Sequence, residues 1–306
     1  MIVNYEGKEI KLPDFLIVGA AKSGTTSLHY YLQSYPEIFM TAGKEPWFFS
    51  YVNNPPNYCY PEKFSVIWKL EDYIDLFKES KTTQLIGEAS PSYLYTHNQT
   101  IKNIKDVYGD NYQKLQIIII LRNPVKRAYS QFMMFKRDEL EPLDFEQATS
   151  LETIKERMRK NWNIFYDYIG FGLYYTQVRS FMDEFPDVKI LFYDDLVKDE
   201  RKVVQDLCNF LKVDFRDDIK LGKFNKSGVP RINFINNLLA TPSPLKEFIK
   251  SVLPYDVRIK IKHKIFELNL KPKELNKKET DYLSSLFSED ICNLSKLLNA
   301  DLTPWL

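Results

Sequence analysis

The sequence has few cysteines, no long apolar run and almost no excess of either charge. Its 306 residues include only three cysteines, with no CxxC pair and no Cys/His cluster that would indicate zinc. No run approaches the roughly 18 apolar residues of a membrane span, and the first 15 residues lack the form of a signal peptide. Basic and acidic residues nearly cancel, 42 against 41, so no overall field attracts nucleic acid. We therefore expect a cytoplasmic protein without a membrane span or a nucleic-acid partner. The three cysteines are Cys59, Cys208 and Cys292.

The chain does contain short apolar runs that alternate with helical patterns. Four runs have the length and β-branched content of buried parallel strands, at 14–19, 84–90, 116–124 and 188–196. The segments 25–34, 124–140 and 173–185 have helix-compatible spacing. This alternation predicts an α/β fold, a three-layer α/β/α sandwich with a central parallel sheet.

No linker, repeat or low-complexity tract divides the chain. We expect a single domain over 1–306, with 1–12 as an N-terminal extension. Glycines are absent from 232–306, and the apolar spacing of 276–298 predicts a long helix. We expect this helical part to pack on the same domain.

The stretch "GAAKSGTT" at 19–26 resembles a phosphate-binding loop with its lysine displaced. Gly19 and Gly24 keep the spacing of the common motif, but Lys22 lies inside the loop and two threonines follow it. A strand precedes the loop and a helix follows, so the amides of the helix start can bind an anion. The sequence predicts a P-loop-like phosphate site here, and a glycine-containing turn with a surface lysine is the alternative.

The strand at 116–121 ends in an arginine, where a magnesium-dependent NTPase needs a carboxylate. Arg122 cannot bind a metal, but its guanidinium can hold a second phosphate with two hydrogen bonds. Ser130 lies eight residues further on, a little over two helical turns, and can meet the same anion. We therefore expect no metal. A nucleotide kinase or NTPase is disfavoured but stays an alternative, as does a surface ion pair for Arg122.

Seven motifs, in this order, resemble sulfotransferases that use 3′-phosphoadenosine-5′-phosphosulfate (PAPS). They are "AKSGTTSL", "GKEPWFF", "GEASPSYLY", "ILRNPVKRAYSQF", "GLYYTQVRSFMDEFP", "ILFYDDL" and "FNKSGVPR". The resemblance is closest to the branch with the heparan sulfate N- and 3-O-sulfotransferases, as a soluble member of bacterial type. It runs from about residue 13 to the closing "LLNADLTPW" and implies a P-loop-like donor site.

The resemblance implies which residues hold PAPS and its desulfated product PAP. Lys22 would contact the oxygen between phosphorus and sulfur, and Arg122 with Ser130 would bind the 3′-phosphate. The loop after Lys22 would hold the 5′-phosphate, and a later loop would close over the 3′ end. The implied donor-binding residues are Lys22, Ser23, Gly24, Thr25, Thr26, Arg122, Ser130, Lys226, Ser227 and Gly228.

Glu45 in "GKEPWFF" matches the family's general base, which takes the acceptor's proton, so Glu45 and Lys22 are the catalytic candidates. An acidic loop residue paired with Lys44 is the alternative for Glu45. Acceptor-side candidates are Lys44, Trp47 and Glu88. The histidines His29, His97 and His263 match none of the family's catalytic positions.

The sequence motifs identify the donor more closely than the acceptor. The heparan enzymes read GEKTP where this chain has "GEASP", so Ala89 replaces a lysine, and the membrane anchor and disulfide of the vertebrate Golgi enzymes are not evident. We expect a carbohydrate acceptor, with a lipid, polyketide or other small molecule as the alternative. A non-catalytic PAP-binding protein is a further alternative.

Two basic stretches, 155–160 and 258–264, could contact a polyanionic acceptor, but at helical spacing each is more typical of a solvated helix face. Aromatic residues around 47–48 and 162–168 could stack on sugar rings or pack in the core.

Overall fold

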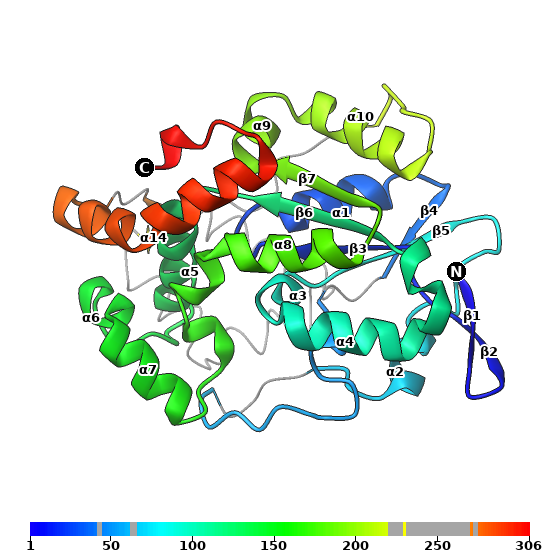
Figure 1. Cartoon of the computed structure of the whole chain (residues 1–306), viewed down its shortest axis with the longest axis horizontal. Coiled ribbons are helices and arrows are strands. Elements are labelled where there is room, and N and C mark those ends of the chain that lie inside the picture. The colour runs from blue at the N-terminus through cyan, green and yellow to red at the C-terminus, as the bar shows by residue number, and fades with distance from the viewer. Residues whose placement is uncertain (42–44, 62–65, 220–228, 231–269, 272–274) are drawn as a thin grey trace, which may run out of the picture.

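The computed structural model describes residues 1–41, 45–61, 66–219, 229–230, 270–271 and 275–306. Its centre is a five-stranded parallel sheet in the order β4-β5-β3-β6-β7 (Figure 1). The strands are β3 (Phe15–Gly19), β4 (Ile38–Met40), β5 (Leu85–Ala89), β6 (Gln116–Leu121) and β7 (Val188–Phe192). Strands at all four predicted places are thus confirmed, but the run 188–196 was predicted too long, because a helix begins at Tyr193. The sheet also contains β4, whose three residues give too short a run to be recognised.

The central strands are apolar on both faces because both faces are covered by helices. Every residue of β3 is buried, as are the last five residues of β6. Ile118 and Ile120 pack in one apolar cluster with Leu28 and Leu207, whereas Ile117 and Ile119 pack in another. The sheet therefore separates two cores.

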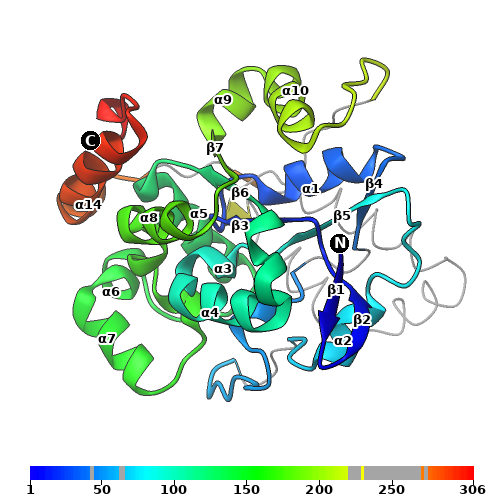
Figure 2. The same cartoon turned by 45° about the vertical axis from the view of Figure 1, so that its right-hand side comes forward.

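Helices form a layer on each side of the sheet, which confirms the three-layer α/β sandwich (Figure 2). On one side lie α1 (Thr25–Gln33), α9 (Tyr193–Lys198) and α10 (Glu200–Leu211). On the other lie α3 (Ser92–Tyr95), α4 (His97–Tyr108), α5 (Pro124–Arg137) and α8 (Tyr174–Glu184). The predicted helices at 25–34, 124–140 and 173–185 correspond to α1, α5 and α8.

The predicted long helix is α14 (Lys277–Leu298), which packs on α5 and α8. Its start carries a capping box: the Asn276 side chain accepts the Glu279 N–H, and the Glu279 side chain accepts the Asn276 N–H. Further along, the Asp290 carboxylate accepts the N–H of Tyr174 at 2.7 Å and that of Tyr175. A side chain of α14 thus caps the start of α8, where Leu173 offers no capping group.

Smaller elements surround this sandwich. The first residues form an antiparallel hairpin, β1 (Ile2–Tyr5) and β2 (Lys8–Lys11), and β1 packs on α4. The remaining elements are α2 (Leu70–Asp75), α6 (Phe145–Thr149), α7 (Leu151–Arg159) and the short antiparallel pair β8 (Val229–Pro230) and β9 (Leu270–Lys271).

Candidate active site

The predicted phosphate loop connects β3 to α1. Lys22 and Gly24 both have left-handed backbone, with φ of 66° and 100°. A Cβ on Gly24 would also lie 3.0 Å from Leu196 and 3.1 Å from Tyr193, so only glycine fits at this position. Left-handed turns before a helix start direct successive backbone N–H groups toward a bound anion. The local geometry is therefore that of a phosphate cradle.

Arg122 lies directly beside this loop. Its Nη1 donates to the carbonyl oxygen of Lys22 at 2.9 Å, and its guanidinium carbon lies 4.6 Å from the centre of the Tyr193 ring. Its Nε is buried and has no hydrogen-bond partner among the described residues. Burial lowers the pKa of Arg122 from its ordinary value. A half-buried cation with an unused Nε donor suits an anionic ligand, and the arginine after β6 therefore fits a phosphate.

The Lys22 side chain contacts the face of α5 that also carries Ser130. The Lys22 Nζ lies 3.2 Å from the Met134 sulfur, and Met134 is four residues after Ser130, one helical turn away. Ser130 is buried. The structure thus brings the loop, Arg122 and the Ser130 face of α5 together at the carboxyl ends of β3 and β6, where parallel sheets bind ligands.

Glu45 lies over the carboxyl end of β5, the strand next to β3. Its N–H donates to the Ala89 carbonyl at 3.1 Å, and the Trp47 N–H donates to the Ser90 hydroxyl at 3.0 Å. Ser90 in turn donates its N–H to Ile17 of β3 at 3.1 Å. The half-buried Glu45 is therefore held at the same edge of the sheet as the phosphate loop.

Two acceptor-side candidates are buried. Glu88 has no exposed surface, and its Oε2 accepts the hydroxyls of Tyr93 at 2.7 Å and Tyr73 at 3.2 Å. Burial raises the pKa of Glu88 to about 7, with the Glu45 charge adding to the rise. Trp47 packs its ring 4.6 Å from that of Phe165 and is only 5% exposed. Neither side chain offers a surface to an acceptor in this conformation.

The start of α5 is fixed from several elements. The Asn123 Oδ1 accepts the N–H groups of Val125 and Lys126, and its Nδ2 donates to the Trp305 carbonyl at 3.3 Å. The Tyr174 hydroxyl donates to the Arg122 carbonyl at 3.0 Å. Arg122 therefore sits in a backbone segment that α8 and the segment around Trp305 both hold.

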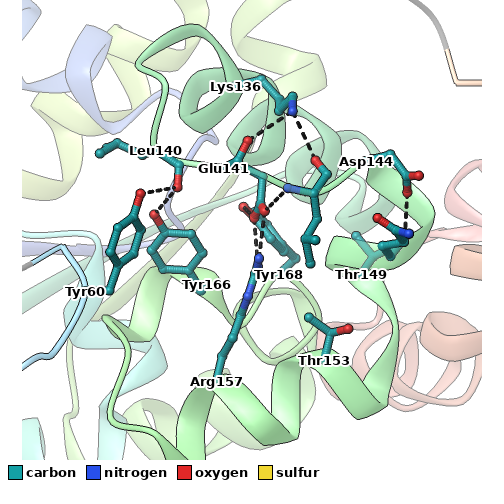
Figure 3. A network of polar contacts seen from close by, with 12 residues as sticks. Tyr60, Lys136, Leu140, Glu141, Asp144, Thr149, Thr153, Arg157, Tyr166 and Tyr168 are labelled. Carbon is teal, nitrogen blue, oxygen red and sulfur yellow. Dashed lines mark hydrogen bonds and ion pairs between the residues drawn. The ribbon is translucent and has the colours of Figure 1, made fainter.

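The basic stretch 155–160 is only partly a solvated face. Lys155, Arg159 and Lys160 are exposed, but Arg157 points inward and forms two 2.7 Å bonds to Glu141 (Figure 3). The Tyr168 hydroxyl also donates to Glu141, at 2.7 Å. The expectation of a solvated helix face is wrong for Arg157, because its side chain pairs with a buried carboxylate sixteen residues earlier. The apolar spacing of α7 gives no sign of this partner.

This buried pair connects to α5 through the segment around 165–168. Arg127 of α5 donates to the Tyr168 carbonyl and, at 2.7 Å, to the Gln131 side chain. Gln131 donates to the Phe165 carbonyl, also at 2.7 Å. The helix that carries Ser130 is thereby held by two of its own side chains, three residues before Ser130 and one residue after it.

Several predicted residues lie outside the described part of the chain. They are Lys44, Lys226, Ser227, Gly228, His263 and the basic stretch 258–264. Of the aromatic residues considered for sugar stacking, Phe48, Phe165, Tyr166 and Tyr168 are buried in the core. His29 is also buried, and His97 hydrogen-bonds to the Tyr95 carbonyl.

Sequence reasoning missed four residues around the site: Met134, Tyr174, Tyr193 and Trp305. Tyr193 directly follows β7, so the rule that ligands bind beyond strand ends was a usable signal. Trp305 and Tyr174 carried no such signal, since their contacts with Asn123 and Arg122 cross 182 and 52 residues of sequence.

Within the described ranges, no helix combines the length and the hydropathy needed to cross a bilayer. The same ranges hold no group of three or more His, Cys, Asp or Glu side chains with metal-site geometry. The described cysteines are free thiols, Cys208 buried and the other two exposed.

A glycine-containing loop between a parallel strand and a helix, with an arginine directly after the neighbouring strand β6, is typical of P-loop-like α/β folds. The sequence model of the sulfotransferase domain matches residues 12–227, the greater part of the chain. The chain belongs to this sulfotransferase domain family, which confirms the resemblance seen in the sequence motifs.

Solved structures agree with this assignment. A sulfotransferase from Alicyclobacillus acidocaldarius is 28% identical, with a TM-score of 0.71 over 97% of this chain and 99% of that one. A mouse sulfotransferase complexed with PAP is 15% identical, with a TM-score of 0.50 over 97% of this chain and 98% of that one, which shows a shared fold.

Curated relatives match over part of their length. The membrane-associated sulfotransferase kil1 of Dictyostelium discoideum is 35% identical over 48% of this chain and 31% of its own length. Mouse heparan sulfate glucosamine 3-O-sulfotransferase 3B1 is 26% identical over 66% of this chain and 47% of its own. The matched part of this chain thus spans less than half the length of each of these relatives.

Proposed function

We propose that the protein transfers a sulfuryl group from PAPS to a hydroxyl or amine of a carbohydrate acceptor. The observation that carries the proposal is the convergence of three features at one sheet edge. The phosphate loop and the half-buried Arg122 follow the neighbouring strands β3 and β6, and Glu45, which follows β4, bonds to the end of β5 on the other side of β3.

A donor with two separate phosphate positions fits this arrangement. The loop and the start of α1, with Ser23, Gly24, Thr25 and Thr26, would hold the 5′-phosphosulfate. Arg122 and Ser130 would hold the 3′-phosphate, and the unused Arg122 Nε supplies a donor for it. Lys226, Ser227 and Gly228 keep their proposed role in closing over this end.

The reaction needs a base on the acceptor side and a positive charge on the leaving side. The acceptor oxygen or nitrogen forms a bond to sulfur while the bond from sulfur to the bridging oxygen breaks. That oxygen keeps the electron pair, and Lys22 stabilises the charge on the departing PAP. Glu45 takes the acceptor's proton. Positioning and charge stabilisation supply the catalysis.

The carbohydrate acceptor is supported by the names of the relatives, which include a heparan sulfate 3-O-sulfotransferase and human carbohydrate sulfotransferase 15. A lipid, polyketide or small molecule is the competing acceptor class. Lys44 and Trp47 remain proposed acceptor-side residues, and contact with Trp47 requires that its buried ring become accessible.

The first test measures transfer of labelled sulfate from PAPS to desulfated heparan and chondroitin oligosaccharides, a phenol and a glycolipid. We expect Glu45→Gln to lower kcat by about 100-fold or more, because general-base catalysis supplies a factor of that order. PAP affinity, measured by calorimetry, should stay within about threefold, since Glu45 faces the acceptor. Glu71→Gln, an exposed acid of α2, is the matched control. Transfer by Glu45→Gln at the wild-type rate would contradict the mechanism.

The second test compares PAP with 5′-AMP, which lacks the 3′-phosphate. Arg122→Ala should weaken PAP binding by at least tenfold, because a charge-assisted bond to phosphate contributes about 1.5–3 kcal/mol. Its effect on 5′-AMP binding should be much smaller. Equal losses for both nucleotides would show that Arg122 supports the loop and does not read the 3′-phosphate. Magnesium-dependent ATP turnover would favour the NTPase alternative, and PAP binding without transfer to any acceptor or to water would favour a non-catalytic binder.

A further inference from the structure

We propose that Glu88 is a positioning residue for Glu45, and that it acts as a neutral, protonated acid that fixes the segment 45–50. This inference rests on the proposed function. It gives Glu88 a role in which its side chain does not contact the acceptor.

Glu88 organises the two aromatic side chains that hold the segment 45–50. Tyr93 donates its hydroxyl to Glu88 and accepts the N–H of Phe49 at 3.3 Å. Tyr73 donates its hydroxyl to Glu88, and its ring stacks on Phe48 with centroids 4.1 Å apart. Both tyrosines therefore transmit the position of one buried carboxyl to the segment that begins with Glu45.

The first residues of this segment also hydrogen-bond to the end of β5. The bonds from Glu45 to Ala89 and from Trp47 to Ser90 place it against the two residues that follow Glu88. The segment 45–50 and Glu88 thus form one rigid unit. A fixed base is required because proton transfer needs hydrogen-bond distance to the acceptor.

The hydrogen bonds also locate the proton. Both tyrosine hydroxyls donate to Oε2, so in the neutral acid this oxygen is the carbonyl and the proton lies on Oε1. These hydrogen bonds and one from Ser90 favour the ionised form, but burial opposes them and is the larger effect, and the nearby Glu45 charge adds to it. With its pKa raised to about 7, Glu88 is mostly neutral below that pH.

Ionisation of Glu88 would place a second negative charge where an anionic donor must bind. The titratable groups that act on Glu88 are Tyr73 of α2, Tyr93 of α3, Tyr108 of α4 and Glu45. Burial raises the pKa of all three tyrosines well above 10, so they stay neutral. A titration near neutral pH in this cluster therefore belongs to the carboxyls.

The experiment compares the pH profiles of wild type and Glu88→Gln, using PAPS and a desulfated heparan oligosaccharide, with PAPS hydrolysis where no glycan is sulfated. Glutamine keeps a carbonyl acceptor for the tyrosines but cannot ionise. We expect wild-type kcat/KM for PAPS to fall roughly tenfold between about pH 7 and 8.5, since kcat/KM reports ionisations of the free enzyme. Glu88→Gln should retain its rate across this range. In wild type, the infrared band of a protonated carboxyl should disappear near pH 7, and Glu88→Gln should lack it.

A second pair of variants tests the positioning link. Tyr93→Phe removes the hydroxyl shared by Glu88 and Phe49, and it should lower kcat while leaving PAP affinity unchanged. Tyr108→Phe is the matched control, because this buried tyrosine donates to the Pro13 carbonyl and not to Glu88. Equal kcat values for the two variants would overturn this inference but not the proposed function. So would a pH profile of Glu88→Gln that has the same shape as the wild-type profile. A wild-type protein that transfers to no acceptor and not to water would overturn the proposed function as well.

Discussion

Glu88 makes the stability of the fold depend on pH in a defined direction. Its pKa is about 7 in the folded chain against an ordinary value of 4.5, so the folded state binds this proton more tightly than the unfolded state. The stabilisation is complete below about pH 4.5 and is lost as the pH rises through 7.

The matching prediction concerns unfolding by urea. The free energy of unfolding of wild type, minus that of Glu88→Gln, should fall by about 2–3 kcal/mol between about pH 5 and pH 8. Glu71→Gln provides the control, because an exposed glutamate should give a difference that is nearly constant with pH. A constant difference for Glu88→Gln would show that Glu88 ionises as freely in the folded chain as in the unfolded one.

For single residues, the sequence predicts the role of a side chain well where a motif identifies it. It predicts that role poorly where the role depends on the buried surroundings of the side chain. Lys22 and Arg122 stand at strand ends, and the structure joins them by a hydrogen bond. The run 84–90 predicted a buried strand around Glu88, but its hydrogen-bond partners were not predictable, because Tyr73 and Tyr93 come from two helices that the sequence does not place around β5.

At the scale of elements, the link between α7 and the end of α5 depends on one buried ion pair. Arg157 and Glu141 are 4% and 3% exposed, and the Arg157 guanidinium also lies 4.6 Å from the Trp162 ring centre. Loss of the arginine would leave a buried carboxylate whose hydrogen bonds come only from neutral groups, Tyr168 and the Leu143 N–H among them. An uncompensated buried charge is far more costly than a lost surface contact.

We therefore expect Arg157→Met to reduce the free energy of unfolding by about 3–5 kcal/mol, the cost of breaking a buried pair. Arg159→Met, two residues away on the exposed face of α7, should change it by less than about 0.5 kcal/mol. Urea denaturation of the two variants measures the difference. Similar small effects for both would mean that the pair is not maintained in solution.

The helices and strands were largely predictable because their signals are local. β6 and α14 are recognisable from a short apolar run and from 3.6-residue spacing within a single segment. The cap that Asp290 provides for α8 was not predictable, because it joins groups more than a hundred residues apart. Long-range polar contacts of this kind have no periodicity to reveal them.

At the scale of the whole molecule, distant parts of the chain meet beside Arg122. The segment around Trp305 packs against Tyr174 of α8 and Phe192 of β7, with ring centroids 6.4 and 5.8 Å apart. Its indole Nε1 donates to Asp194, and its carbonyl accepts from Asn123, the cap of α5. The segment that carries Arg122 is thus held in part by a residue at the C-terminal end of the described chain.

Trp305 should therefore influence donor binding without touching the donor loop. Trp305→Ala keeps the carbonyl that accepts from Asn123 but removes the ring contacts and the Nε1 bond to Asp194 that hold this carbonyl in place. We expect it to weaken PAP binding by about 5–10-fold, on the order of the 1–1.4 kcal/mol that one hydrogen-bonded anchor contributes. Binding of 5′-AMP should change less, because Asn123 adjoins Arg122, the proposed 3′-phosphate ligand, and not the 5′-phosphate loop. Calorimetry at a temperature well below the unfolding transition of each variant separates this effect from lost stability. Leu306→Ala, at the exposed neighbouring residue, is the control. Unchanged PAP affinity in folded Trp305→Ala would show that α8 alone is sufficient to hold the Arg122 segment in place.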